Sequence, residues 1–434
     1  ALMGALGVVM MLKHINKFNL FIFYPALLCA FVCLFATLRA YFATNLNSKN
    51  EANPIAFIFI ISALWIVFFH FPLLEFLHSN LEFNSFSGAL LFVSLVLFCF
   101  MLTLLLPLLL ALISFKLTKI YFVFFTLTNA LAVYFVSTYG VFLDKTMMGN
   151  LFNTNPAEAG EFLSLKMALW IVVLGIVPAC FLFALKLAKP ARKTLAKLSA
   201  LSLLTLILLA FINFSNLLWI DKHSKQLGAL VMPYSYLINS ARFVGGELAK
   251  NKREILLPDA SIANDKKAVV VLVIGESARL KNFSLYGYER ETNPLLSKVQ
   301  GLKHFYAKSS TTYTSASVKN MLSHKDTSAL YEILPNYLSR AGVSVVWRSA
   351  NWGEPPLHLP SENVLRYSEL SQKYPKLDDS YESALIANLN EEIKKANSPK
   401  VLIILHTSTS HGPTYYKKYP PEFEKFTPVC KSVE

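Results

Sequence analysis

Carboxylate and hydroxyl side chains in the C-terminal half of the chain have the types and positions that nucleophilic chemistry needs. Glu276 is the first charged residue after a β-branched apolar run, 268–274, which ends at a glycine. Such a run is typical of a strand buried on both faces of a parallel sheet, and ligands bind beyond the carboxyl ends of these strands. The hydroxyl-rich stretch 309–317 precedes an apolar, helix-compatible segment, 318–322. A hydroxyl there would cap the helix and face its positive end, which suits a nucleophile that attacks a phosphate.

Two histidines after a third apolar run complete the candidate set. His406 and His411 follow the predicted strand 401–405. A threonine hydroxyl has a pKa too high to ionise unaided, whereas a zinc ion lowers the pKa of a bound oxygen by many units. Carboxylate and imidazole suit zinc, so the pattern predicts a zinc site that needs further ligands. The alternative is that all these side chains are solvated loop residues without shared chemistry.

An α/β domain over residues 266–434 would position these side chains. Apolar runs bounded by turn residues predict strands, and helical periodicity predicts the segments between them. The glycine at 342 fits a helix end. We expect strands at 268–274, 343–347 and 401–405 and helices at 331–340 and 385–395.

The first half of the chain is predicted to be a transmembrane helical bundle over residues 1–219. Apolar residues make up 54% of the 434 residues, and nearly all long apolar runs lie in this half. Each run is long enough to cross the hydrocarbon core of a bilayer. We expect five or six helices, since the role of the first run is open: 19–41, 54–74, 88–114, 118–142, 166–188 and 197–219.

The charged residues predict the topology of the membrane domain. Lys and Arg residues gather at 116–119 and 186–197, which predicts that these two loops are cytoplasmic. The outer loop 143–165 and everything after the bundle then lie outside, with 220–265 as a linker along the membrane surface. The formal net charge of +14 fits topology signals and anionic membrane lipids. We expect no nucleic-acid partner, because the sequence contains no nucleic-acid-binding motif.

A polar stripe in the outer loop could bind a lipid headgroup. Asn150, Thr154 and Glu158 are spaced i, i+4, i+8, which places them on one face of a helix. Such a face beside the membrane could hold a headgroup amine. The alternative is the solvated face of an interfacial helix.

Long, gapless motifs in the C-terminal half resemble the phosphoethanolamine transferase family that decorates lipid A and related surface glycans. The matching residues are 273–279, 282–294, His406 and 410–430. The resemblance implies an alkaline phosphatase/sulfatase-like fold with a mostly parallel sheet. It also implies that Glu276 is a zinc ligand and that Thr314 is the nucleophile, which binds zinc and carries a phosphoethanolamine intermediate.

The resemblance also implies the substrates and the location. Asn150, Thr154 and Glu158 would contact the headgroup of the donor, phosphatidylethanolamine, and His411 would line the substrate site. The acceptor would be lipid A or another glycan, and the protein would be a multi-pass protein of the bacterial inner membrane with its catalytic domain in the periplasm. Two alternatives stay open: a phosphoglycerol transferase of the same superfamily, and a non-catalytic membrane scaffold.

Three departures from the family pattern bear on these expectations. Cysteines that often flank the family's threonine loop are replaced by Ser310 and Asn320, so we expect packing alone to hold this loop. A Gly-Cys-Lys motif is replaced by residues 351–356, which puts a lysine contact to phosphate in doubt. The family's later Asp-His zinc ligands would lie beyond residue 434, and Cys430 lacks a partner in the globular half. We therefore expect the natural chain to be longer.

Overall fold

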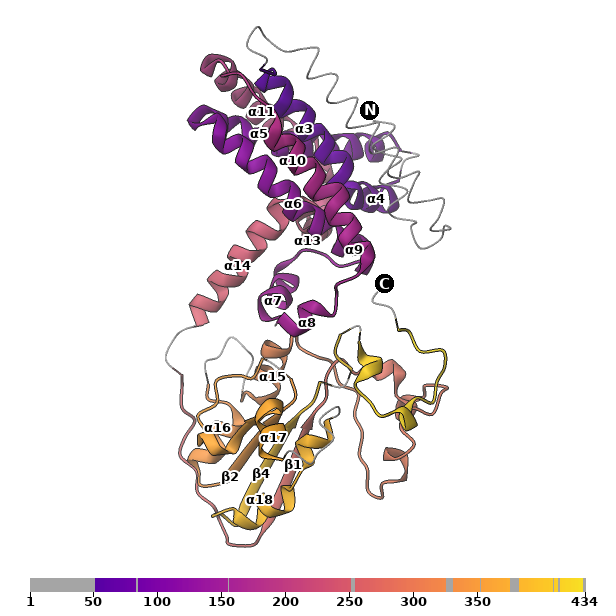
Figure 1. Cartoon of the computed structure of the whole chain (residues 1–434), viewed down its shortest axis with the longest axis vertical. Coiled ribbons are helices and arrows are strands. Elements are labelled where there is room, and N and C mark those ends of the chain that lie inside the picture. The colour runs from indigo at the N-terminus through magenta and orange to yellow at the C-terminus, as the bar shows by residue number, and fades with distance from the viewer. Residues whose placement is uncertain are drawn as a thin grey trace. The chain divides into compact units, whose positions relative to one another are not determined.

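The computed structural model divides into two compact units. One unit runs to Met148 and resumes from Ser164 to Arg242, and the other contains Gly149–Leu163 and Phe243–Glu434. Figure 1 traces the elements of both units. The structure describes residues 51–82, 85–154, 156–250, 254–324, 331–351, 353–374, 382–408, 410–412 and 414–431.

Long apolar helices form the first unit. Among the described residues, four helices are long and apolar enough to cross a membrane, and a fifth span is possible if α3 and α4, bent by 59°, count as one. The predicted run 19–41 lies outside the described residues. The elements are α3 (Pro54–Phe69), α4 (Phe71–Asn80), α5 (Phe86–Ile113), α6 (Phe115–Tyr139), α9 (Leu165–Trp170), η2 (Ile171–Ile176), α10 (Val177–Ala184) and α11 (Arg192–Ile212).

The first unit packs through aromatic side chains and a few polar contacts between helices. Helix α5 contacts α3, α6 and α11. The rings of Trp65 and Phe122 meet edge-on at 5.2 Å, and Trp65 Nε1 donates to Thr126 Oγ1 at 3.2 Å. A buried tryptophan contributes a large apolar ring, and its indole N–H usually finds a hydrogen-bond partner. The helices of this unit therefore pack as a bundle.

The predicted surface linker is largely helical. Four helices follow α11 in this region: η3 (Phe214–Asn216), α12 (Leu217–Lys222), α13 (Ser224–Leu230) and α14 (Tyr234–Lys250). Tyr234 Oη donates to the carbonyl of Leu102 at 2.8 Å, and Tyr236 Oη donates to Asn129 Oδ1 at 2.9 Å. These bonds join the first half of α14 to the helical unit, which sequence periodicity did not indicate.

A parallel sheet lies at the centre of the second unit. In the described residues it has four strands in the order β1-β4-β2-β3. Ile274 pairs with His406, His406 with Ser349, and Ser349 with Arg366, so the carboxyl ends of the strands are in register. The strands are β1 (Ala268–Ile274), β2 (Ser344–Ser349), β3 (Val364–Arg366) and β4 (Lys400–His406).

Alternating side chains of the central strands bury both faces of the sheet. Leu402 and Ile404 of β4 face a cluster that includes Val318 and Leu322 of α15 (Thr314–Leu322). Val401, Ile403 and Leu405 face the opposite cluster, which includes Leu370 of α17 (Tyr367–Lys373) and Leu385 of η8 (Glu382–Ile386). Successive residues of a strand point to opposite faces, so helices cover both sides of the central strands.

The first strand differs from the expectation that it is buried on both faces. Val270, Val271 and Val273 are 58%, 49% and 59% exposed, and only Ile274 is buried. Of β1, only Leu272 and Ile274 pack against the two core clusters that cover β4 and β2, so the described helices leave most of this strand uncovered. β1 lies at the edge of the strand order and pairs with β4 alone among the described strands. A run of β-branched residues predicts a strand but not the strand's place in a sheet.

The remaining helices match the expected segments with shifted ends. The predicted helix 331–340 begins at Leu334 (α16, Leu334–Arg340), and Gly342 after it has a φ of +91°. The predicted helix 385–395 is divided into η8 and α18 (Leu389–Lys395), because Asn388 between them is left-handed. The other short helices are α7 (Lys145–Asn153), α8 (Pro156–Gly160), η4 (Leu280–Asn282), η5 (Ser284–Tyr286), η6 (Leu296–Lys298), η7 (Ser361–Asn363), η9 (Tyr415–Lys417) and η10 (Pro421–Phe423).

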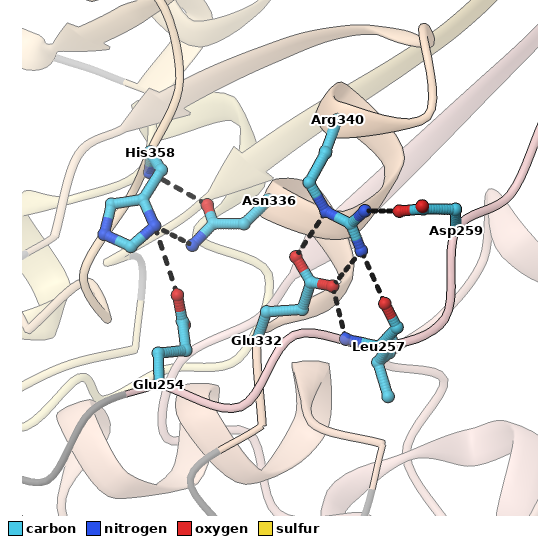
Figure 2. A network of polar contacts seen from close by, with 7 residues as sticks. All are labelled: Glu254, Leu257, Asp259, Glu332, Asn336, Arg340 and His358. Atoms are coloured by element: carbon cyan, nitrogen blue, oxygen red, sulfur yellow. Dashed lines mark hydrogen bonds and ion pairs between the residues drawn. The ribbon is translucent and has the colours of Figure 1, made fainter.

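Within the second unit, a polar network connects the segment 254–259 to Glu332 and to Arg340 of α16 (Figure 2). Arg340 donates to the buried carboxylate of Glu332 and to Asp259 Oδ1, each at 2.5 Å, and to the carbonyl of Leu257 at 2.8 Å. The amide of Leu257 in turn donates to Glu332 Oε1 at 2.7 Å. The Arg340 hydrogen bonds lower the pKa of Glu332 despite its burial. The chain is therefore held to α16 just before it enters β1.

Candidate active site

The carboxylate of Glu276 lies at the centre of the candidate site. It follows β1 by two residues, at the edge of the sheet where the carboxyl ends of the strands meet. Ser277 next to it has a φ of +51° and donates its hydroxyl to Glu276 Oε1 at 2.7 Å. A residue other than glycine in this left-handed region is uncommon and is typical of functional sites.

The hydroxyl of Thr314 contacts this carboxylate. Thr314 Oγ1 donates to Glu276 Oε2 at 3.0 Å. Thr314 is the first residue of α15, and the residue before it, Tyr313, is the cap and makes no side-chain capping bond. The expectation that a hydroxyl caps this helix is therefore wrong for Thr314, because its hydroxyl is used by Glu276. The expected place of Thr314 at a helix N-terminus holds.

The loop after β2 supplies a residue that the sequence did not single out. Asn351 Nδ2 donates to Glu276 Oε2 at 2.8 Å and to the carbonyl of Thr407 at 3.1 Å. Gly353, with a φ of +88°, brings the same loop against α15, since a Cβ at this position would lie 3.1 Å from the amide nitrogen of Ser315. The signal was available: Asn351 is a polar residue just beyond a strand, at the sheet edge where ligands bind.

The two candidate histidines occupy different environments. His411 Nδ1 lies 3.5 Å from Glu276 Oε1, so this residue joins the site. His406 is the last residue of β4, is fully buried, and shares a hydrogen bond of 3.1 Å with the hydroxyl of Ser349. Burial lowers the pKa of His406, although the charges of Glu354 and Glu276 oppose this shift. Neither histidine is thus a simple solvated loop residue.

The electrostatics of the site favour an ionised Glu276. Burial alone would raise the pKa of its carboxyl group. The contact and charge of His411, together with hydrogen bonds from Ser277 and Thr314, lower this pKa to about 2. A carboxylate that accepts several hydrogen bonds stays charged in this way. The carboxyl group of Glu276 is therefore ionised at neutral pH.

Hydrogen bonds hold the loop before Thr314. Asn320 Nδ2 donates to Ser310 Oγ at 2.5 Å, and the hydroxyls of Ser309 and Ser317 lie 2.9 Å apart. The expectation that packing alone holds this loop is therefore wrong. Two polar side chains join the positions where the family often has cysteines, so the same two points of the chain are connected without a covalent bond.

The outer-loop stripe is only partly helical. Asn150 lies in α7, but α7 ends at Asn153, and Glu158 lies in the separate helix α8. The expectation of one continuous helical face is therefore wrong. Thr154 Oγ1 donates to the carbonyl of Asn150 at 2.8 Å, and Pro156, which has no amide hydrogen, begins the second helix. The loop residues 149–163 belong to the same unit as Glu276 and Thr314.

The oxygen donors of Glu276 and Thr314 converge in a way that suits a divalent zinc ion. Both side chains are partly buried, and carboxylate and hydroxyl oxygens are ligands that such an ion accepts. They are fewer than the roughly four ligands of a typical zinc site. Within the described ranges, no group of three or more His, Cys, Asp or Glu side chains could hold a metal ion.

Comparison with known families finds a separate match for each half of the chain. Residues 99–248 match the family described as phosphoethanolamine transferase EptA/EptB, and residues 268–434 match the sulfatase family. A structure from Neisseria meningitidis, the integral membrane protein lipooligosaccharide phosphoethanolamine transferase A, aligns with a TM-score of 0.75 at 24% identity, covering 88% of this chain and 73% of that one. This likeness supports the predicted fold, in which membrane helices are followed by a sulfatase-like parallel sheet.

Sequence relatives identify the family. The phosphoethanolamine transferase EptA of Helicobacter pylori is 39% identical over 379 residues, which cover 86% of this chain and 71% of that protein. The protein of the same name from Salmonella typhimurium is 30% identical over 331 residues, which cover 71% of this chain and 60% of that protein. The resemblance and the enzyme class expected from the sequence motifs are thereby confirmed. This chain belongs to the phosphoethanolamine transferase family, as a multi-pass membrane member with a sulfatase-like domain.

Proposed function

We propose that the chain transfers phosphoethanolamine from phosphatidylethanolamine to lipid A phosphate or another surface glycan, through a covalent intermediate on Thr314. One observation carries the proposal: Thr314 Oγ1 lies at the start of α15 and 3.0 Å from the carboxylate of Glu276. A helix N-terminus favours an incoming phosphate, because its free amide groups point towards the ligand. The protein would act in the bacterial inner membrane, with the α/β domain in the periplasm.

The reaction would proceed in two displacements at phosphorus. In the first, a bond forms between Thr314 Oγ1 and the donor phosphorus while the bond to the glycerol oxygen breaks, and diacylglycerol leaves with the proton. In the second, the oxygen of an acceptor O–H group attacks the same phosphorus while the bond from phosphorus to Thr314 Oγ1 breaks, and the proton of the acceptor restores the Thr314 hydroxyl. A covalent intermediate of this kind divides one difficult transfer into two easier steps.

The other side chains of the site would orient the reacting groups. Asn351 donates to the same oxygen of Glu276 as Thr314 does, so it fixes the carboxylate that faces the nucleophile. Glu276 and Thr314 would hold a zinc ion, which when bound would lower the pKa of the hydroxyl. His411 would line the substrate site, and Asn150, Thr154 and Glu158 would contact the headgroup of the donor.

A phosphoglycerol transferase is the second candidate function. Glu158 favours phosphoethanolamine transfer over phosphoglycerol transfer, because a carboxylate can pair with the amine of ethanolamine and a glycerol headgroup has no amine. A non-catalytic scaffold is the third possibility, and it would not need Thr314.

Intact mass of the purified protein tests these alternatives. The protein is incubated with zinc and either phosphatidylethanolamine or phosphatidylglycerol. We expect a gain of one phosphoethanolamine with the first lipid, no gain with the second, and no gain in Thr314→Ala. A gain of phosphoglycerol would support the second candidate. No gain with either lipid, in a protein that has bound zinc, would refute the proposal in favour of a scaffold.

A further inference from the structure

The outer loop 149–163 contacts the α/β domain near both of its ends, each time beside a residue of the candidate site. Near its start, the ring of Phe152 stacks on Phe243, with centroids 5.6 Å apart and planes 4° apart. Phe243 then meets Tyr313 edge-on, with centroids 6.1 Å apart. Offset and edge-on aromatic pairs of this kind are favourable. Because Tyr313 directly precedes Thr314, the first contact adjoins the nucleophile.

A glycine allows this first contact. A Cβ at Gly149 would lie 3.1 Å from Phe243 Cε2 and 3.1 Å from Cδ1 and Cε1 of Tyr313. Gly149 is buried, so the loop backbone packs closely against both rings. The carbonyl of Tyr313 accepts the amide of Ser317 at 3.1 Å, which joins Tyr313 to the first turn of α15. A displacement of the Tyr313 ring would therefore be transmitted to Thr314.

An ion pair makes the second contact, near the end of the loop. Glu161 Oε1 lies 3.7 Å from Lys418 Nζ, and each side chain is 22% exposed. Lys418 Nζ also donates to the carbonyl of His411 at 2.7 Å. Gly412 leaves room for this arrangement, since a Cβ there would lie 2.5 Å from Glu161 Oε2. The same lysine thus holds the outer loop and the backbone of His411.

We propose that Tyr313 and Lys418 are positioning residues, which hold the outer loop against the site and so set where the donor phosphorus meets Thr314. The proposal rests on the proposed function, because Asn150 and Thr154 would bind the donor headgroup between these two contacts. Neither positioning residue touches the reacting atoms. Tyr313 acts through the start of α15, and Lys418 acts through the His411 loop.

The experiment measures two quantities on the full chain in nanodiscs that contain phosphatidylethanolamine. The first is the rate of the phosphoethanolamine mass gain at Thr314, and the second is amide hydrogen exchange of the peptide 149–163. The variants are Tyr313→Ala and Lys418→Ala, with the conservative variants Tyr313→Phe and Lys418→Arg. Melting temperature is measured for each, because a purely structural role would lower stability and rate together.

Matched controls lie in the same unit. Gly149→Ala is compared with Gly160→Ala in the same loop, because a Cβ at Gly160 would meet nothing within 4 Å. Lys418→Ala is compared with Lys394→Ala, which removes an exposed pair with Glu391 at 3.1 Å. Exposed ion pairs contribute little, so this control should behave as the wild type.

We expect Tyr313→Ala, Lys418→Ala and Gly149→Ala to slow the mass gain by at least about tenfold, since a displacement of about 1 Å can cost on the order of a hundredfold. Exchange of the loop peptide should become faster in the same variants. The conservative variants and the controls should keep both quantities near those of the wild type, and melting temperatures should change little.

Two results would overturn the inference. In one, the loop exchanges faster but Thr314 gains mass at the wild-type rate, so release of the loop has no consequence. In the other, the mass gain slows while exchange of the loop is unchanged, so these residues act by another route. If the wild type gains no mass, the proposed function fails, and unchanged loop exchange in all variants would still refute the docking contacts.

Discussion

Replacing Gly353 by alanine should slow chemistry at Thr314, because this glycine packs directly against the start of α15. Gly353 has a φ of +88°, and an added Cβ would lie 3.1 Å from the amide nitrogen and 3.3 Å from the Cα of Ser315. Ser315 follows Thr314 in the first turn of the helix. The methyl group must therefore displace either that turn or its own loop, which carries Asn351, a hydrogen-bond partner of Glu276.

The expected magnitude has a stability part and a rate part. A left-handed backbone costs a residue with a Cβ about 1–2 kcal/mol, which lowers the free energy of unfolding. Relieving the close approach requires a shift of roughly half an ångström, because carbon atoms normally pack about 3.5–4.0 Å apart. A misplacement of about 1 Å can cost on the order of a hundredfold, so a shift of half this size should slow the first transfer about tenfold.

Gly301→Ala is the matched control. Gly301 has a φ of +77°, and a Cβ there would meet nothing within 4 Å, so it shares the backbone cost and lacks the contact. Thermal unfolding should show similar losses for both variants, while the mass gain at Thr314 should slow only in Gly353→Ala. Equal rates in the two variants would refute the reasoning, because the contact with Ser315 would then have no effect on the nucleophile.

Three further predictions concern the carboxylate, the threonine loop and the polar network. The pKa of Glu276 is about 2 against an ordinary 4.5, so its charge stabilises the metal-free fold above about pH 4.5 and loses this effect as the pH falls towards 2. The difference in melting temperature between the wild type and Glu276→Gln should therefore become smaller between pH 4.5 and pH 2. A difference that stays constant over this range would contradict the prediction. Ser310→Cys with Asn320→Cys should form a disulfide worth about 2–4 kcal/mol, detected as a melting temperature lowered by reductant, whereas free thiols after oxidation would count against it. Arg340→Ala should speed amide exchange in 254–259 and leave α18 unchanged, because Arg340 bonds to Leu257 and Asp259; unchanged exchange in 254–259 would argue against the network as a fastening.

The sequence predicts three of the four described strands because their signal is local, whereas β3, which has only three residues, was not expected. The runs 268–274 and 401–405 are apolar and β-branched, and polar residues follow each one. In a parallel sheet such ends meet at one edge, so the contact of Glu276 with Thr314 and His411 follows from the order of the elements. The exposure of β1 could not be predicted in this way, since exposure depends on which strands and helices lie beside it.

Contacts between segments that lie far apart in the chain could not be predicted from the sequence. The place of Asn351 just beyond a strand is visible in the sequence, but its partner Glu276 lies 75 positions away and no local pattern identifies it. The bond between Asn320 and Ser310 replaces two cysteines of the family pattern with polar residues, whose complementarity is visible only once the loop is folded. The end of α7 at Asn153 has a local signal, the proline at 156, which breaks the helix that the regular spacing of polar residues predicts.

The outer loop belongs to the second structural unit, although it lies in the membrane half of the sequence. In sequence, residues 149–163 lie between two membrane helices, yet they belong to the unit that contains Glu276 and Thr314. Gly149 and Glu161 make the contacts that place them there, through Tyr313 and Lys418. A transferase must bring the headgroup of a lipid to a nucleophile on another domain, and orientation of the two partners can supply much of the rate. If the loop binds the donor headgroup as proposed, its insertion in the membrane half and its packing on the α/β domain would meet that need, because the headgroup contacts and Thr314 would then move together.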